Sequence, residues 1–301
     1  MNLWQLNVFY QVIKFQGFSR AASEIHLSQP TVSSHIKDLE SYFGCKLIDR
    51  VDKKAIPTKA GEILYRYASK LLRLGEEAES AMAEFQGKIS GKLMIGGSTI
   101  PGGYILPHLI GDFRKKYNDV MVSMTVGDTD SIVEKILDGS IELGVVGAKI
   151  KHKNIEQKDF VEDEMYLIVP IEHKWSKKKS IRPESLLDES FIIRERGSGT
   201  LKSILNSLED TTLTRDSFKI VAEMGSTTAV IQAIKSGIGI SILSPIAIKN
   251  ELKLKTLKAL KIEGVSFKRS FYLTWHKKRT PSPLNKTFFE FLMQTSEWPG
   301  F

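Results

Sequence analysis

Apolar side chains recur at helical spacing through the first part of the chain. Leu3, Leu6, Phe9 and Ile13 lie three or four residues apart, which predicts a helix with one buried face. Gly17 is expected to end that helix. This first helix therefore needs a partner for its apolar side.

Two further helices are predicted close behind it. Ser19 is a suitable N-cap for a helix over residues 20–26. Ser28 is a suitable N-cap for a third helix that Gly44 ends, and Pro30 in its first turn costs no intrahelical hydrogen bond. Two short helices joined by a tight turn form a helix-turn-helix.

The third helix has one apolar and one polar face. Val32, Ile36 and Leu39 are expected to be buried. The opposite face offers short donors and acceptors suited to base edges and phosphates in the major groove, which favours DNA binding over a purely structural helical hairpin. The residues of this face are Gln29, Thr31, Ser33, Ser34, His35 and Lys37.

A small hairpin is predicted after the third helix. Apolar residues at 47–48 and 55–57 flank a short turn, and the cations Arg50, Lys53 and Lys54 lie in or beside that turn. A solvated turn is the simpler interpretation of such a cationic run. A wing beside a recognition helix, however, can contact the adjacent phosphates.

A long amphipathic helix follows the hairpin. Thr58 is a suitable N-cap, and residues 59–86 contain no proline. The apolar seam has spacings of three and four residues over three heptads, which favours pairing with a second chain over packing on the helix's own domain. A dimer would carry two helix-turn-helix units to two half-sites. The seam residues are Leu64, Tyr67, Leu71, Leu74, Ala78, Ala81 and Phe85.

The remainder of the chain alternates strands and helices. This alternation predicts α/β layers with mostly parallel sheets, and about 210 residues are enough for two lobes. Strands are expected at 93–95, 120–126, 143–147, 166–169, 191–193, 220–221, 238–243 and 269–275, and helices at 105–117, 131–137, 200–208, 227–235 and 284–294.

Two predicted strand-to-helix loops are rich in glycine and hydroxyl side chains. They cover residues 96–103 and 197–200, and Arg194 or Arg196 can supply a cation nearby. Hydroxyls and free backbone N–H groups at a helix N-terminus attract carboxylates and other small anions. Each loop alone is equally compatible with a plain turn, but two such loops, one in each half, favour a ligand cleft for an anionic effector.

Composition narrows the class of protein. The 301 residues are 42% hydrophobic and 26% charged, as in globular proteins, and the net charge of +8 permits a polyanionic partner without requiring one. Cys45 is the only cysteine, which fits a reducing cytosol, and we expect its thiol to be buried. No stretch is suited to cross a bilayer and no signal peptide is recognisable, so we expect a cytoplasmic protein with no membrane partner.

Enzyme motifs are not found. The spacing from Gly97 to Gly102 lacks the lysine of a P-loop, and the glycine pairs at 197/199 and 237/239 lack the third glycine of a dinucleotide fingerprint. The six histidines are scattered, without metal-ligand spacing. We therefore expect no catalytic residues, no cofactor and no metal site.

Five segments carry a family resemblance. FSRAA at 18–22, LSQPTVS at 27–33, IKDLE at 36–40, GCKLIDR at 44–50 and PTKAG at 57–61 strongly resemble the LysR-type transcriptional regulators. The resemblance implies an α/β protein with an all-α N-terminal part. Its parts would be a winged helix-turn-helix, a long linker helix, and a two-lobed effector domain similar to periplasmic binding proteins. SSHIKDLE, IGGSTIPGGYILP and RERGSGT look most like family members linked to sulfur or selenium metabolism.

The resemblance also implies a division of the chain and its partners. We expect a DNA-binding domain over 1–58, a dimerisation helix over 59–90 and an effector domain over 91–301. The implied partners are double-stranded promoter DNA, a small-molecule effector and further copies of the chain in a homodimer or homotetramer, with RNA polymerase as an additional candidate. The main alternative classes are a solute-binding module, which the first sixty residues argue against, and an enzyme built on the α/β region.

The site residues implied by the resemblance fall in two groups. Ser34 and His35 stand where many relatives have arginine and glutamine, and Gly147 stands where many have a hydroxyl residue. These departures leave the operator sequence and part of the ligand shell open. The expected DNA-binding residues are Ser28, Gln29, Pro30, Thr31, Ser33, Ser34, His35, Lys37, Arg50, Lys53 and Lys54. The expected effector-binding residues are Ser98, Thr99, Ile100, Gly127, Gly147, Ser198, Gly199 and Thr200.

Overall fold

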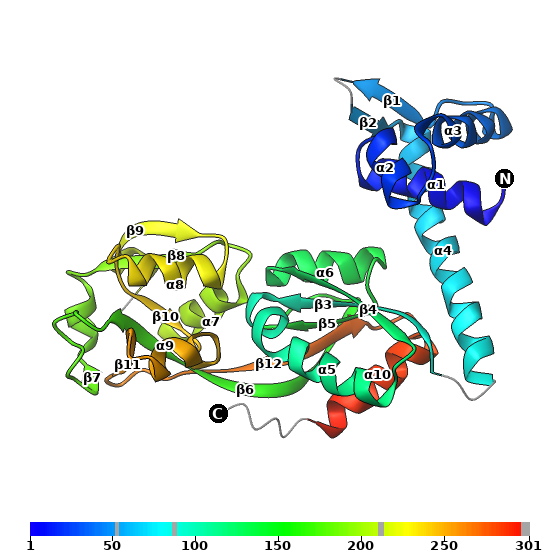
Figure 1. Ribbon diagram of the computed structural model, residues 1–301. Coiled ribbons are helices and arrows are strands. Elements are labelled where there is room, and N and C mark those ends of the chain that lie inside the picture. Colours follow the sequence, from blue (N-terminus) through cyan, green and yellow to red (C-terminus); the bar gives the residue numbers. More distant parts are fainter. Residues whose placement is uncertain (52–53, 86–88, 210–213, 296–301) are drawn as a thin grey trace. The chain divides into compact units, whose positions relative to one another are not determined.

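The computed structural model describes residues 1–51, 54–85, 89–209 and 214–295. The chain divides into two compact units, Met1–Lys88 and Ile89–Phe301 (Figure 1). Each unit has hydrophobic cores of its own.

The N-terminal unit is a winged helix-turn-helix followed by a long helix. Its helices pack around a core that includes Phe9, Ile36 and Leu39. The wing is an antiparallel hairpin in which Arg50 lies opposite Ala55. The elements are α1 (Leu3–Lys14), α2 (Phe18–Glu24), α3 (Gln29–Phe43), β1 (Ile48–Val51), β2 (Lys54–Pro57) and α4 (Lys59–Phe85).

The caps of α3 are those expected from the sequence. The Ser28 side chain accepts a hydrogen bond from the backbone N–H of Thr31 at 3.2 Å. Gly44 ends the helix with φ of +66°, a left-handed conformation that glycine adopts without steric cost. The start and the end of the recognition helix are therefore encoded locally.

Three local expectations in this unit are wrong. Ser19 lies inside α2 rather than capping it, because the extended backbone of Gly17 already provides the carbonyl that accepts from Ala21 N. Leu3 is exposed, since the buried face of α1 is formed by later residues of the helix. Cys45 is also exposed, because it lies in the turn that follows Gly44 at the end of α3.

The long helix α4 packs on α1 through its N-terminal half, where Ala68 is fully buried. Thr58 Oγ1 accepts a hydrogen bond from Gly61 N at 3.0 Å, as expected of an N-cap. A Cβ atom at Gly61 would lie 2.0 Å from the carbonyl oxygen of Leu47, so this close approach to the wing requires glycine. Further along, the predicted seam is solvent-exposed at Tyr67, Leu71 and Leu74 within this chain. The side chains of Ala81 and Phe85, also part of the predicted seam, lie outside the description.

The second unit is built on a mixed sheet with the order β4-β3-β5-β12-β6-β11-β7, from which β10 branches by pairing with β6. β8 and β9 form a separate parallel pair. The strands are β3 (Gly91–Ser98), β4 (Val120–Gly127), β5 (Leu143–Val146), β6 (Ile155–Pro170), β7 (Ser180–Ile181), β8 (Ser190–Arg194), β9 (Lys219–Met224), β10 (Ser241–Leu243), β11 (Leu257–Ile262) and β12 (Phe267–His276).

Two long antiparallel strands join the two lobes of this unit. β6 and β12 pair with one another along ten residues of β12, and both continue from one lobe into the other (Figure 1). The expectation of mostly parallel sheets is therefore wrong: among the described strands of this unit four pairs are parallel, β3 with β4, β3 with β5, β8 with β9 and β7 with β11, and four are antiparallel. β11 and the first half of β6 were not predicted either.

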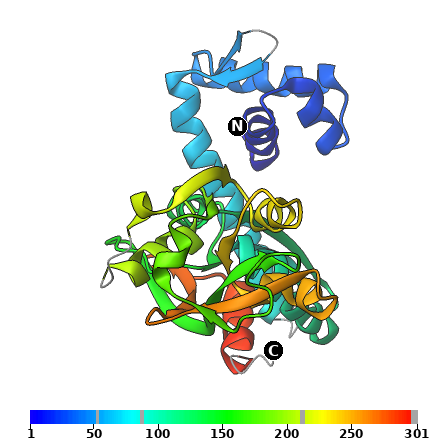
Figure 2. The same cartoon turned by 90° about the vertical axis from the view of Figure 1, so that its left-hand side faces the viewer.

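Helices cover the sheets of both lobes, and Figure 2 shows the molecule from the side of the second lobe. The first lobe contains η1 (Pro101–Ile105), α5 (Leu106–Lys116), α6 (Thr129–Asp138) and α10 (Pro283–Gln294). The second lobe contains α7 (Gly199–Leu208), α8 (Thr227–Lys235), α9 (Lys249–Lys253) and the short 3-10 turns η2 (Pro183–Leu186), η3 (Arg215–Ser217) and η4 (Pro245–Ile248).

Candidate DNA-binding and effector sites

Most of the predicted DNA-binding residues are exposed to solvent, on α3, at its N-cap and on the wing. Gln29, Ser33 and His35 are half-buried. The Nδ1 atom of His35 is shielded from solvent and has no hydrogen-bond partner among the described residues. Lys53 lies outside the described residues. The exposed members of the predicted set are Ser28, Pro30, Thr31, Ser34, Lys37, Arg50 and Lys54.

Arg50 connects the wing to the helix-turn-helix. Its Nη2 atom donates a hydrogen bond to Ser33 Oγ on α3 at 3.0 Å. Its guanidinium lies 4.2 Å from the ring centroid of Phe18 on α2, a cation–π contact. Gln29 also donates to Ser33 Oγ, at 3.3 Å. One arginine therefore fixes the wing against both helices of the motif.

Glu40 forms a second connection between α3 and the wing. Its carboxylate binds Lys46 Nζ at 2.6 Å and accepts from the backbone N–H of Leu47 at 3.0 Å and of Ile48 at 3.4 Å. Burial alone would raise the pKa of this carboxyl, but Lys46 and the two N–H groups outweigh burial and lower the pKa below its usual value. The ionised carboxylate therefore stabilises the junction.

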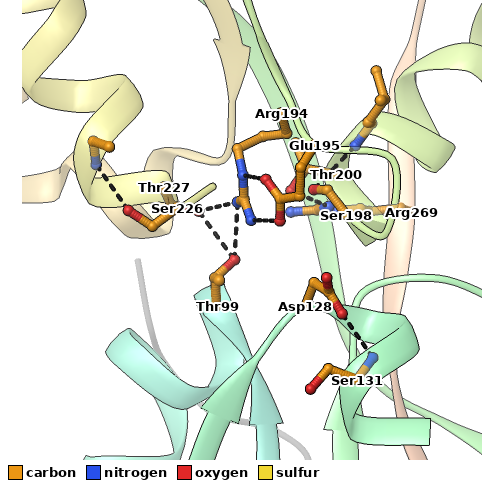
Figure 3. A network of polar contacts seen from close by, with 12 residues as sticks. Thr99, Asp128, Ser131, Arg194, Glu195, Ser198, Thr200, Ser226, Thr227 and Arg269 are labelled. Carbon is orange, nitrogen blue, oxygen red and sulfur yellow. Dashed lines mark hydrogen bonds and ion pairs between the residues drawn. The ribbon is translucent and has the colours of Figure 1, made fainter. Parts of the chain in front are cut away.

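In the second unit, seven of the eight predicted effector residues line one pocket between the lobes. Gly127 does not line the pocket, but its neighbour Asp128 does. Figure 3 shows how the labelled side chains converge on this place from both lobes. The lining residues are Ser98, Thr99, Ile100, Asp128, Thr129, Gly147, Arg194, Ser198, Gly199, Thr200, Arg269 and Phe271.

The predicted glycine-rich loops are tighter than expected. β3 extends through Ser98 and the helical turn η1 begins at Pro101, so little of the segment 96–103 is loop. Ser98, Ser198 and Thr200 are buried rather than exposed on surface turns. A Cβ atom at Gly199 would lie 2.5 Å from Thr129 Oγ1 on the other lobe, so only glycine permits this approach.

Arg194 is the first cation of the pocket. From the sequence, either Arg194 or Arg196 could supply the cation. In the structure Arg194 is 3% exposed and lines the pocket, whereas Arg196 is exposed to solvent. Arg194 Nη1 donates to Thr227 Oγ1 at 2.8 Å and to Thr99 Oγ1 at 3.0 Å. Its Nε and Nη2 atoms donate to the carboxylate of Glu195 at 2.7 and 2.6 Å (Figure 3).

Arg269 is the second cation, and it was not predicted from the sequence. Its Nε donates to Asp163 Oδ2 at 2.8 Å, and its Nη1 donates to Thr200 Oγ1 at 3.2 Å. Burial lowers the pKa of Arg269, Asp163 opposes this effect, and the charge of Arg194 lowers the pKa further. A guanidinium remains protonated despite such a shift, so the two cations repel one another across the pocket.

Two buried polar atoms at this site have no hydrogen-bond partner among the described residues. They are Arg269 Nη2 and Thr129 Oγ1, and both residues line the pocket. Buried polar groups are normally satisfied. An unpaired guanidinium donor and a hydroxyl facing the same pocket are the groups that an oxyanion would satisfy.

The lobes are closed on one another in this structure. Ser203 Oγ on α7 donates to the Gly147 carbonyl at 3.2 Å, and Lys202 forms an ion pair with Asp130 on α6. The volume of the cavity between the lobes is about 10 Å³, roughly the space for one water molecule. A larger ligand therefore requires the lobes to separate or Thr99 and Glu195 to release Arg194.

The described part of the chain offers neither a metal site nor a membrane segment. No group of three or more His, Cys, Asp or Glu side chains that could hold a metal ion is found among the residues described. Across the same residues, no helix is both long and apolar enough to cross a membrane.

A winged helix-turn-helix joined to a two-lobed α/β unit with a polar pocket defines a DNA-binding regulator with an effector domain. Residues 3–62 match the family model of the bacterial regulatory helix-turn-helix protein, lysR family, and residues 86–297 match the LysR substrate binding domain. The chain belongs to the LysR family of transcriptional regulators, which bind promoter DNA and small-molecule effectors, form oligomers and are not enzymes. The predicted family and fold class are thereby confirmed.

Three comparisons illustrate the similarity. The Probable RuBisCO transcriptional regulator of Gracilaria tenuistipitata var. liui is 34% identical over 287 residues, covering 94% of this chain and 93% of its own. Full-length CbnR complexed with its target DNA shares the fold, with a TM-score of 0.72 and 22% identity over 98% of this chain and 100% of its own. The Synechocystis CcmR regulatory domain in complex with 2-PG has a TM-score of 0.63 and 27% identity, covering 69% of this chain and 98% of its own.

Proposed function

We propose that the effector of this regulator is a small oxyanion, a phosphate or carboxylate compound, bound between the two lobes by Arg194, Arg269 and the surrounding hydroxyls. The observation that carries the proposal is the buried Nη2 atom of Arg269, which lacks a partner among the described residues and lies in the same pocket as a second arginine. Arginine pairs with phosphate and carboxylate oxygens through two parallel N–H groups.

The charges around the pocket explain how an anion would act. Three carboxylates, Glu195, Asp163 and Asp128, lie beside the two arginines. Asp128 accepts from Ser131 N at 2.7 Å as the N-cap of α6, and Asp163 is held by Ser244 at 2.7 Å. Within the described part of the chain, the Glu195 carboxylate forms its hydrogen bonds with the Arg194 guanidinium, so an incoming anion would compete with it.

Effector binding would then change the contact between the lobes. In the closed form Arg194 holds Thr99 of the first lobe and Thr227 of the second. An anion that binds the Arg194 guanidinium in place of these partners would change the relative stability of the closed and open arrangements of the lobes. A ligand shifts such an equilibrium only by its difference in affinity for the two states.

We assign DNA recognition to α3 and the wing. Gln29, Pro30 and Ser33 would read bases from the helix face that enters the major groove, and Arg50, Lys53 and Lys54 would contact phosphates. In this assignment residues 1–58 bind DNA, 59–90 pair with a second copy and 91–301 bind the effector. The protein would act in the cytoplasm, where its promoter DNA lies.

The comparisons favour particular ligands and promoters to test. The CcmR complex with 2-PG supports an anionic effector, and the names of the relatives support a RuBisCO promoter as the regulated target. The resemblance to regulators linked to sulfur or selenium metabolism stays a second prediction. It would place a small anionic metabolite that contains sulfur or selenium in the same pocket.

The test is calorimetric titration of the full chain with 2-PG, phosphate, sulfate, selenate and small carboxylates. Arg194→Lys keeps the charge but loses the paired donors, and we expect it to weaken anion binding about 10- to 100-fold. Arg196→Lys is the matched control, because Arg196 is exposed two residues away, and it should leave binding unchanged. Equal affinities for wild type and Arg194→Lys would show that the anion does not bind in this pocket. Binding of neutral ligands alone would refute the proposal that the effector is an anion.

A further inference from the structure

A second and larger cavity lies within the first lobe. It is lined by residues at the beginning of β5, at the end of β12 and in the first turns of α10, and its volume is about 220 Å³. The exposed part of its wall is mainly apolar and comes from Ile141, Leu143, Trp275, Pro281 and Phe289. The polar residues Glu142, His276, Arg279, Thr280, Asn285 and Lys286 complete the lining. The rings of Trp275 and Phe289 meet edge to face, with centroids 5.2 Å apart.

This cavity is separate from the pocket between the lobes. Leu143, the first residue of β5, lines the cavity. Gly147, four residues after Leu143, lines the interlobe pocket. A strand rises about 3.3 Å per residue, so the two positions are roughly 13 Å apart. The two sites have no lining residue in common.

One buried polar atom gives the cavity a specific chemistry. Asn285 is 5% exposed and lines the cavity. Its Nδ2 atom donates to Ser282 Oγ at 3.0 Å, whereas its Oδ1 atom is buried without a hydrogen-bond partner among the described residues. An amide oxygen in an apolar wall is costly unless a donor reaches it.

Two charged side chains at this cavity, Glu142 and Arg279, are engaged by the protein itself, and the third, Lys286, is exposed to solvent. Glu142 accepts from the backbone N–H of Ser282 at 2.8 Å and so occupies the N-terminus of α10. Arg279 donates to the carbonyls of Ile136 and Leu137 at 2.8 and 2.7 Å, at the C-terminus of α6. Burial and the charge of Arg279 lower the pKa of His276, which keeps that ring neutral at pH 7.

We propose that this cavity is a second ligand site, for a small neutral aromatic molecule that carries one hydrogen-bond donor, such as a phenol or an indole. The ring would lie among Leu143, Trp275 and Phe289, and the donor would reach Asn285 Oδ1. An apolar cavity of about 150 Å³ is large enough to bind benzene. The larger cavity here leaves room for the ring and a substituent.

The experiment uses full-length protein labelled with 5-fluorotryptophan and titrated with p-cresol, followed by fluorine NMR. The chain has four tryptophans, and Trp275→Phe identifies the Trp275 signal. We expect p-cresol to shift the Trp275 signal saturably. Toluene has the same ring and methyl group without the donor, and should bind up to about tenfold more weakly.

Two variants separate filling of the cavity from a general effect on the fold. Ile141→Phe places a ring in the cavity and should abolish the p-cresol shift. Asn285→Leu removes the amide and should erase the preference for p-cresol over toluene. If Asn285→Leu does not fold, the ratio of the wild-type affinities for p-cresol and toluene still tests whether the hydrogen-bond donor of the ligand contributes to binding.

Other results would overturn the proposal. They are no shift at saturating p-cresol, a shift confined to other tryptophans, equal affinity for toluene, or undiminished binding in Ile141→Phe. Arg194→Lys alters only the interlobe pocket and should leave the p-cresol titration unchanged. The failure of one site is thus distinguishable from the failure of the other.

Discussion

Arg194, which lines the interlobe pocket, forms a two-point ion pair with its neighbour in sequence, Glu195. Nε and Nη2 of the guanidinium donate to the two carboxylate oxygens at 2.7 and 2.6 Å. The Arg194 side chain is 2% exposed and that of Glu195 is 21% exposed. This is the geometry with which arginine binds a carboxylate or phosphate ligand. Glu195 therefore occupies the donors that an anionic effector needs.

The first prediction follows from this competition. Glu195→Gln removes the competing charge and should strengthen anion binding about tenfold, because one charge-assisted hydrogen bond contributes roughly 1.5–3 kcal/mol and glutamine still forms part of it. Calorimetry with the tightest-binding anion measures the change. Glu223→Gln is the control, since Glu223 lies on β9 and forms only a 3.9 Å contact with Arg215. Unchanged or weaker binding in Glu195→Gln would mean that Glu195 does not compete.

Local signals explain the part of the fold that the sequence predicted well. The Ser28 cap, the glycine stop at Gly44 and the Thr58 cap depend on a few neighbouring residues, and all three are present in the structure. The helix over 227–235 matches α8 (Thr227–Lys235) in both bounds. Such features need no knowledge of the distant chain.

Long-range pairing explains most of what was missed. β6 contains the polar run EDE at 162–164 and lacks regular alternation, yet its partners β12, β11 and β10 make it one strand. Arg269 becomes part of the pocket only because β12 lies beside β6, where Asp163 faces it from 106 positions earlier in the chain. The spacing of residues within either strand does not predict the ion pair of Arg269 with Asp163.

The second prediction separates phosphate contacts from base contacts. Lys54→Ala should weaken binding to all DNA sequences alike and reduce the slope of log K against log salt by about one unit, because one phosphate contact is lost. Gln29→Ala should instead change the preference among operators. Gel-shift titrations at several salt concentrations measure both effects. Lys115→Ala, in the effector unit and paired with Asp112, is the control that should change neither.

The third prediction concerns the exposed seam of α4. Leu71 and Leu74 are 38% and 57% exposed in the single chain. If a second copy covers them, Leu71→Asp with Leu74→Asp places four carboxylates in the paired interface, which should cost several kcal/mol and dissociate the dimer. Sedimentation velocity measures the assembly. Arg66→Asp with Lys70→Asp is the control. If the variant with both leucines replaced sediments like the wild type, this seam is not the dimer interface.

The fourth prediction is a pH dependence at Glu40. The pKa of Glu40 is lower in the folded protein than its usual value of 4.5. The ionised carboxylate therefore stabilises the fold above about pH 4.5, and this stabilisation is lost as the pH falls through the folded-state pKa. Glu40→Gln should lower the stability of the DNA-binding unit by about 1–2 kcal/mol at pH 7.

Scanning calorimetry of the full chain between pH 7 and pH 3 checks this dependence. The difference between wild type and Glu40→Gln should shrink towards the acid end, because the wild-type carboxyl is then protonated too. Glu24→Gln is the control, since Glu24 ends α2 and is exposed. A difference that stays constant with pH would assign the effect to packing rather than to charge.

The last prediction tests whether Arg269 is needed for stability as well as for ligand binding. The side chains of Arg269 and Asp163 are 4% and 1% exposed, and Ser244 donates to the same carboxylate at 2.7 Å. Arg269→Met leaves Asp163 as a buried charge without its counter-ion, which should cost about 3–5 kcal/mol in urea unfolding of the effector unit. Adding Asp163→Asn removes the charge while keeping an acceptor for Ser244, so the double variant should recover most of the loss. Anion binding should remain weak in the double variant, because the guanidinium is still absent. A double variant no more stable than Arg269→Met alone would show that the cost comes from lost packing and not from the unpaired carboxylate.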